Sequence, residues 1–409
     1  MRPTWPHLVV LTVVVVGSFA AGLTFRASGV TPGSKGKPGA TAPSSRLSSD
    51  RTGPWGDLRV TRIVIEPLES AAAALIPPEP TRWVLPQQSP VGVERMLADS
   101  GMDPALIRRI APTISWDPAL GASVVQPDVE AVMAIPPKVR ADFYLELSRY
   151  PVNQYQAKPF RFRQAFVNQW FEAASLSDKT LGILKRLLYT RGDTVFISDV
   201  QAACAQIDSK DEQAKMLKAL SRTSTLLVNL VIRPDTDIDA LTSYWGFGKR
   251  LRDVRPILES LKRVPQGMPL DISHLLTRFA RKRLYAFPAR DGKSLDPLYD
   301  CHWSSMNFWN DPPDDRLNET SFVVHTIMTD YVKVAEGDFR FGDVVLLGKS
   351  EDELIHSCVY IADNIVFTKN GPSHLTPWVL MELDDLLAYY EMPDRSAVRA
   401  YRPKDVSER

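Results

Sequence analysis

The chain is poor in cysteine and almost free of net charge, and each scarcity excludes a class of protein. Its 409 residues include only three cysteines, which is too few for a fold held by a framework of disulfides, and at least one thiol stays unpaired within the chain. The 49 basic and 48 acidic residues leave a formal net charge of +1, so no overall field draws the chain to nucleic acid. We therefore expect packed cores and no nucleic-acid partner.

Long hydrophobic runs are also scarce, and the clearest one lies near the start of the chain. The 18 residues from Leu8 to Phe25 carry no charge, and a helix of that length just crosses the hydrocarbon layer of a membrane. We assign residues 1–26 to a single-pass membrane anchor. A cleaved secretory signal is the alternative, because small residues at Ala20 and Gly22 suit a cleavage site.

The segment after this run has the composition of a tether. Residues 27–56 are rich in Gly, Ser, Pro and Thr, which is typical of a flexible linker that holds a domain away from a membrane. The basic residues from Arg26 to Arg46 outnumber Arg2, and by the positive-inside rule they favour the cytoplasm for the following domains. Although this count of basic residues favours the cytoplasm, we expect the soluble domains to lie outside it.

Residues 57–287 are expected to form a mainly helical domain of unknown role, which is a candidate site for an unknown protein partner. A strand is predicted at its start, over 58–65. The clearest helix has Ser177 as N-cap and leucines at helical spacing up to Leu188, with Gly192 just past its end. Further helices are predicted after Pro136-Pro137 and over 160–174, 210–222, 235–245 and 271–285.

The sequence pattern changes after Pro288, where a polar loop leads to a short helix that carries a cysteine at its start. A helix is predicted to begin at Asp300-Cys301 and to end near Asp311. Cys301 is thereby placed at a helix N-terminus, whose positive end lowers the pKa of a thiol toward neutrality. Cys204 lies among alanines in a helical segment, and it fits the commoner role of a small buried thiol.

Three short apolar runs after this helix predict sequential antiparallel strands. They cover 344–347, 355–361 and 365–371, and turn residues lie between them. Alternation places His356, Cys358 and Tyr360 on one face of the middle strand. We expect that face to lie under the helix that carries Cys301, so that a nucleophile and its base meet.

These features together resemble the NlpC-type cell-wall peptidases, a permuted papain-like superfamily. The resemblance covers 288–409 and rests on a cysteine that follows an aspartate at a helix start, Gly342-Asp343 before an apolar strand, and a histidine that opens a strand-turn-strand hairpin. It implies that Cys301 is the nucleophile, that His356 is the base, and that the substrates are peptide bonds of peptidoglycan stems. The family commonly has Ser and Gly after its cysteine, where this chain has His302 and Trp303.

The third catalytic residue is predicted from the geometry of the hairpin. A three-residue turn over Ala362–Asn364, with Asn364 in the left-handed conformation, pairs Ile361 with Ile365 and brings Asn370 opposite His356. An amide oxygen there would fix the tautomer of the imidazole. A two-residue turn would shift the register by one and bring Lys369 to that place instead.

Two further residue assignments accompany this triad. Thr368, which lies diagonal to His356, is the alternative third member. The oxyanion is expected to bind the backbone N–H of Cys301, helped by the hydroxyl of Tyr285 or Tyr299.

The expected fold class is thus α+β, with a membrane helix, a mainly helical middle domain and a papain-like domain with a small antiparallel sheet. The expected function is that of a membrane-anchored thiol hydrolase of amide or peptide bonds, without cofactor or metal. Two alternatives stay open. A zinc site would use the thiols and imidazoles of Cys301, His302, His356 and Cys358. A tethered binding or scaffold protein would carry the papain-like domain in an inactive form.

Overall fold

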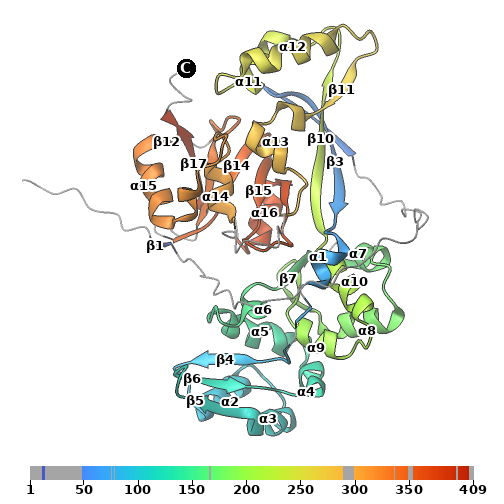
Figure 1. The fold of residues 1–409 in the computed structure, drawn as a ribbon, viewed down its shortest axis with the longest axis vertical. Coiled ribbons are helices and arrows are strands. Elements are labelled where there is room, and N and C mark those ends of the chain that lie inside the picture. The colour runs from blue at the N-terminus through green and yellow to red at the C-terminus, as the bar shows by residue number, and fades with distance from the viewer. Residues whose placement is uncertain are drawn as a thin grey trace, which may run out of the picture.

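The computed structural model describes residues 12–13, 48–74, 76–77, 79–164, 167–288, 299–335, 337–348, 353–392 and 395–404. Within these residues the chain combines many helices with several antiparallel sheets (Figure 1). The expected α+β class is therefore confirmed.

The largest sheet lies in the C-terminal part and carries the hairpin predicted from the sequence. Its strands follow the order β12-β17-β13-β14-β15-β16 and are all antiparallel. The two-residue β1, Thr12–Val13, pairs parallel with β14. The other strands are β12 Tyr331–Val334, β17 Val398–Pro403, β13 Val344–Gly348, β14 Glu353–Ala362, β15 Ile365–Lys369 and β16 Trp378–Glu382. The three predicted sequential strands are confirmed as β13, β14 and β15.

Helices cover both faces of this sheet. One face, with Val359 and Phe367, shares its apolar cluster with α14 (Cys301–Met306) and α15 (Thr320–Asp330). The other face, with Cys358 and Val366, packs against α16 (Leu383–Tyr389). Alternation along the strands sends successive side chains to opposite faces, so both faces are apolar and buried.

A second sheet forms the long ribbon in Figure 1 and pairs strands that are distant in sequence. Its order is β11-β10-β3-β2. The strands are β2 Ser48–Gly53, β3 Gly56–Ile65, β10 Thr223–Ile232 and β11 Met268–Asp271. The strand predicted over 58–65 is confirmed within β3. The expectation of a flexible linker does not hold for 48–53, because these residues pair with β3.

The middle of the chain contains two small three-stranded sheets among its helices. The strands are β4 Trp83–Pro86, β5 Ile114–Asp117, β6 Ala122–Val125, β7 Phe160–Arg163, β8 Tyr189–Arg191 and β9 Thr194–Ile197. The helices are α1 Glu69–Ala73, α2 Pro90–Asp99, α3 Pro104–Ile110, α4 Val129–Ala134, α5 Pro137–Ser148, α6 Gln154–Ala157, α7 Val167–Ala173, α8 Asp178–Leu187, α9 Val200–Ala205, α10 Lys210–Leu220, α11 Ile238–Trp245, α12 Leu251–Lys262 and α13 Arg278–Arg283.

The predicted helices of this region are largely confirmed, whereas its short strands were missed. Ser177 caps α8 by accepting a hydrogen bond from the N–H of Thr180. Gly192 does not end that helix; its φ of 54° makes the turn of the β8–β9 hairpin. The helix predicted over 160–174 begins instead with β7, which pairs with β9. Pairing with a distant strand overrides local helical propensity there.

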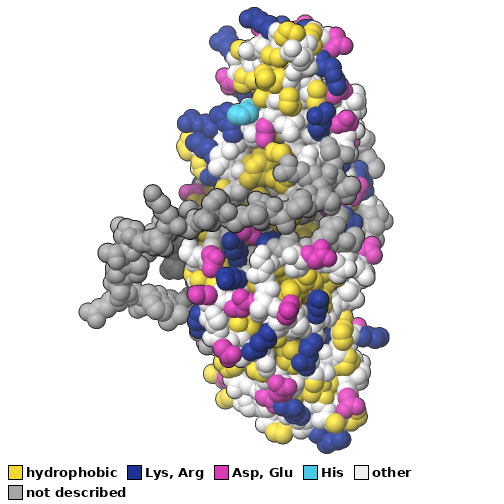
Figure 2. Space-filling model, turned by 90° about the vertical axis from the view of Figure 1, so that its right-hand side faces the viewer, with side chains coloured by type: hydrophobic (Ala, Val, Ile, Leu, Met, Phe, Trp, Pro, Cys, Tyr) yellow, Lys and Arg dark blue, Asp and Glu magenta, His cyan; other side chains and the backbone are white. Residues whose placement is uncertain are grey.

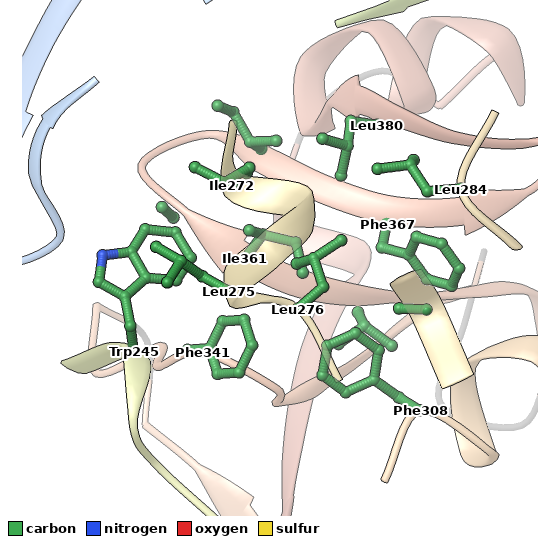
Figure 3. Close-up of a cluster of buried hydrophobic side chains, with 14 of the residues drawn as sticks. Trp245, Ile272, Leu275, Leu276, Leu284, Phe308, Phe341, Ile361, Phe367 and Leu380 are labelled. Carbon is green, nitrogen blue, oxygen red and sulfur yellow. The ribbon is translucent and has the colours of Figure 1, made fainter. Parts of the chain in front are cut away.

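One apolar cluster spans the boundary expected at 287/288. It joins Leu58 and Val228 of the ribbon sheet to Phe367 of the C-terminal sheet. In Figure 3, Trp245 of α11 lies beside Phe341, with ring centroids 5.5 Å apart. The ribbon sheet and its helices therefore share a core with the hairpin that carries His356.

The middle of the chain is also tied to the C-terminal sheet by ion pairs. Asp385 of α16 binds Arg62 of β3 at 2.8 Å and also binds Arg163 of β7. Arg161 donates to the backbone oxygen of Tyr389 at 2.5 Å. Because its carboxylate is almost fully buried between two guanidinium groups, Asp385 fixes α16 against both β3 and β7.

No helix among the described residues is long and apolar enough to cross a membrane. The membrane segment predicted over 8–25 lies outside the described residues, except for Thr12 and Val13. On the face drawn in Figure 2, basic and acidic side chains are interspersed. That distribution agrees with the small net charge and with the expected lack of an overall field.

Candidate active site

Cys301 is the first residue of α14, as predicted. Asp300 is the N-cap, and its Oδ1 accepts a hydrogen bond of 2.9 Å from the N–H of Trp303. The indole of Trp303 stacks on Tyr299, with centroids 3.8 Å apart, and its burial holds the first turn of the helix in place. Cys301 is 8% exposed, whereas Cys358 is fully buried. Because α14 has only six residues, its dipole adds little to the field at the thiol.

His356 lies on the opposite face of β14 from the one we expected. Ser357, the next residue, points toward the middle of α14, where its hydroxyl lies 2.6 Å from that of Ser305 in a hydrogen bond. The His356 ring is completely buried on the α16 side, where it stacks on Tyr390 with centroids 4.4 Å apart. The expectation that the His356 face lies under α14 is therefore wrong.

Cys301 and His356 nevertheless lie close together, because the β14–β15 hairpin opens at this end. The β14–β15 ladder runs from Ala362–Ile365 to Val359–Phe367 and does not reach His356 in the described hairpin. The imidazole of His356 lies close enough to the Cys301 thiol to lower its pKa. A thiol at the start of α14 can thus meet an imidazole from the other face at the place where the strands separate.

The register of the hairpin agrees with the prediction, although the turn does not. Val359 pairs with Phe367, as the three-residue turn required, but the turn has two residues, Asp363 and Asn364. A bulge at Ile361 restores the register that a two-residue turn would otherwise shift. Asp363, not Asn364, takes the left-handed conformation, with φ of 52°.

Thr368 is the residue that contacts His356. Its Oγ1 lies 2.8 Å from His356 Nε2, and its hydroxyl donates to Asn370 Oδ1 at 3.2 Å. Since Thr368 has only one proton to give, its oxygen accepts from Nε2–H of the imidazole. Asn370 does not bond the ring directly; its amide donates to Met381 Sδ at 3.0 Å. The orienting group is therefore Thr368, with Asn370 behind it.

This chain of hydrogen bonds fixes one tautomer of His356. With its proton on Nε2, the ring keeps the lone pair on Nδ1. Nδ1 is buried and has no conventional hydrogen-bond partner among the described residues. A buried basic nitrogen without a proton is the form that can accept one from a neighbouring thiol.

His302, the residue after Cys301, is a second imidazole in contact with its thiol. Its Nδ1 lies 2.9 Å from Ser357 Oγ. Side-chain ligand atoms of Asp300, Cys301 and His302 all lie within 4.8 Å of one another. We did not assign His302 to the triad from the sequence. The signal was its presence where the resembled family has a serine.

The two imidazoles reverse the effect of burial on Cys301. Burial raises the pKa of the thiol, but its interactions with His302 first and then with His356 outweigh burial and hold that pKa well below its usual value. For His302, burial lowers the pKa, yet the charge of Cys301 raises it to about 9. Burial instead raises the pKa of Cys204 to about 11 and also raises that of Cys358.

Two further charged groups lie near the thiol. Burial and then the charge of Cys301 raise the pKa of Asp300. Lys369 is completely buried, and its Nζ donates to the backbone oxygens of Gly371 and Ser373 at 2.5 and 3.1 Å. Burial lowers the pKa of Lys369 to about 7, partly offset by the charge of Cys301.

The remaining expectations about this region have different outcomes. The zinc alternative needed Cys301, His302, His356 and Cys358 together, but the close group in the described residues is Asp300, Cys301 and His302. In that group Asp300 caps the helix and His302 bonds Ser357. Tyr285 cannot help at the oxyanion, because its hydroxyl donates to the backbone oxygen of Leu226 at 2.7 Å.

Comparisons with protein-family models, with curated proteins and with solved structures find no match to this chain. The interpretation of the site therefore depends on its own geometry and chemistry.

Proposed function

We propose that the C-terminal part of the chain is a thiol hydrolase that cleaves an amide or peptide bond. The observation that carries the proposal is the contact of the Cys301 thiol with two buried imidazoles, which hold its pKa well below the usual value. The thiolate is the nucleophilic form of cysteine. By contrast, burial raises the pKa of the other two cysteines.

The roles follow from the hydrogen bonds. Cys301 attacks the carbonyl carbon, and its backbone N–H, which has no partner within the first turn of a helix, faces the oxyanion. The amine leaves with a proton from an imidazolium, and a thioester of Cys301 remains. Water then hydrolyses the thioester while His356 Nδ1 accepts its proton. Thr368 and Asn370 hold the ring in the tautomer that this step requires.

The substrate class rests on the sequence resemblance. The NlpC-type peptidases act on peptide bonds of peptidoglycan stems, and an N-terminal anchor with the domains outside the cytoplasm would place this enzyme beside that polymer. Stem peptides are therefore the first substrates to test. The same site chemistry suits any amide whose carbonyl reaches Cys301.

The test is hydrolysis of a panel of peptidoglycan-stem peptides and simple acyl amides by the full chain. Cys301→Ser is the inactive variant, and Cys204→Ser, at a buried thiol in the middle of the chain, is the matched control. We expect activity in the wild-type and Cys204→Ser proteins and none in Cys301→Ser. Equal activity in all three would refute the proposal. Labelling of folded wild-type protein by an acyl-type thiol probe separates an enzyme with another substrate from an inactive binding protein.

A further inference from the structure

A closed ring of hydrogen bonds protonates His302 on Nδ1. The Ser305 hydroxyl donates to the backbone oxygen of His302 at 3.2 Å, and it accepts from Ser357, whose oxygen is 2.6 Å away. Ser357 has then spent its proton and can only accept from His302 Nδ1, at 2.9 Å. The other nitrogen of the ring remains for the neighbouring Cys301 thiol.

The two imidazoles of the site therefore differ in their acceptors. His302 has an oxygen acceptor at Nδ1 and the sulfur of Cys301 close by, so both N–H groups of an imidazolium find partners. His356 has one acceptor, Thr368, and a buried Nδ1 without a conventional partner. A buried imidazolium is therefore more stable at His302, where both of its protons have acceptors, than at His356, where only one has.

From this geometry we propose that His302 is a second functional imidazole: as the imidazolium it holds the Cys301 thiolate in the resting site, and it leaves His356 neutral as the base. The inference rests on the proposed function and deepens it. The proton of the thiol moves to His302, so the pair stays neutral overall. The leaving amine takes this proton, and the proton that water gives to His356 during hydrolysis of the thioester restores the charge on His302.

The other titratable groups around Cys301 and His302 are consistent with a charged His302 and a neutral His356. Asp300 lies beside Cys301 on the same segment, and Lys369 lies near both on β15. Cys358 on β14 and Tyr390 after α16 face the thiol from the other side, and burial raises the pKa of each, so both stay neutral. The charge of the Cys301 thiolate acts on His302 more strongly than that of Asp300 does.

The test is the pH dependence of alkylation of Cys301 by iodoacetamide in the full chain, followed on the Cys301 peptide by mass spectrometry. The variants are His302→Gln, Ser357→Ala and His356→Gln, with His325→Gln at an exposed histidine of α15 as control. We expect His302→Gln to move the midpoint upward by a unit or more, which lowers the rate about tenfold at any pH below the wild-type midpoint. Ser357→Ala should give a smaller upward shift. His356→Gln should abolish hydrolysis with a smaller shift of the midpoint than His302→Gln.

A large shift in His356→Gln and none in His302→Gln would overturn this inference and leave the proposed function standing. A wild-type Cys301 that titrates like a free thiol would overturn both. NMR titration of the His302 ring in wild-type protein avoids any effect of substitution on folding. We expect that ring to remain protonated at pH 8, and a neutral ring at pH 7 would contradict the inference.

Discussion

Two buried polar clusters of this molecule differ in how completely their charged groups are paired. In the middle of the chain, Arg140 and Asp199 are fully buried, and Arg140 Nε lies 2.8 Å from Asp199 Oδ2. Tyr144 donates to the second oxygen of Asp199 at 2.5 Å, and Arg140 also donates to the backbone oxygens of Val132 and Arg186. In the C-terminal part, the Cys301 site has two imidazoles around one thiol and leaves His356 Nδ1 without a conventional partner.

The difference teaches which buried cluster holds the fold and which one can react. Every charge of the Arg140 cluster is matched within it, so removing one partner leaves an uncompensated buried charge. The Cys301 cluster keeps a basic nitrogen without a proton beside an ionisable thiol, which costs stability and, in the proposed mechanism, accepts a proton. Variants of the two clusters should therefore fail in different assays.

The largest effect on activity is expected at the nucleophile. Cys301→Ala should abolish hydrolysis because no other described cysteine has an imidazole beside it. Its thermal unfolding should change less than that of a variant of the Arg140–Asp199 pair, since only one sulfur atom is lost. Turnover and melting temperature, measured on the same preparation, check both parts. Residual hydrolysis at the wild-type rate would remove Cys301 from the mechanism.

The largest effect on stability is expected in the other cluster. Asp199→Ala leaves Arg140 charged and buried, and breaking a buried pair in this way costs about 3–5 kcal/mol. Chemical denaturation gives the free energy of unfolding. Lys138→Ala, at an exposed ion pair with Asp142, is the control and should change it by less than ~0.5 kcal/mol. A loss of unfolding free energy of similar size in both variants would show that the buried pair contributes no more to stability than the exposed one.

The hydrogen-bond chain behind His356 should give a graded loss of turnover. Thr368→Val removes the acceptor for Nε2–H, whereas Asn370→Ala removes only the acceptor behind it. We expect Thr368→Val to lose more than Asn370→Ala, and both to lose less than the ~10²- to 10⁴-fold that removing an acid–base group costs. Steady-state rates of variants with matched melting temperatures test this order. A more severe defect in Asn370→Ala would restore the direct contact predicted from the sequence.

A smaller effect is expected in the pH dependence of stability. The folded pKa of His302 is raised to about 9 by Cys301, above the value of about 6.5 for an unfolded histidine. A raised pKa contributes stability that is complete below about pH 6.5 and disappears as the pH rises through about 9. The difference in unfolding free energy between wild type and His302→Gln should therefore shrink from pH 6 to pH 10. A difference that is independent of pH would mean that His302 is not charged in the folded state.

Local patterns in the sequence were enough for much of the site. The helix start at Cys301 and the three strands follow from capping and alternation. The face of the sheet on which His356 lies could not be predicted in this way, because alternation shows which side chains share a face but not which face meets a given helix. The length of the turn was also predicted wrongly. The register is nevertheless the expected one, because the bulge at Ile361 compensates for the shorter turn.

The organisation of the rest depended on contacts between distant segments. β3 pairs with β10 across more than 150 intervening residues, and the sequence around Leu58 does not specify its partner. The strands of the middle region have four residues or fewer, which is too short for a clear alternating pattern. For these reasons the sequence suggested a mainly helical region where small sheets also occur.

The most direct test of the account is to expose wild-type protein to a limiting amount of iodoacetamide at pH 6.5 and map the alkylated cysteine. Two protonated thiols and one thiolate are expected at that pH. We predict that Cys301 is modified well before Cys204 and Cys358, and that this preference disappears when the protein is unfolded in denaturant. Equal modification of all three cysteines in the folded protein would contradict it.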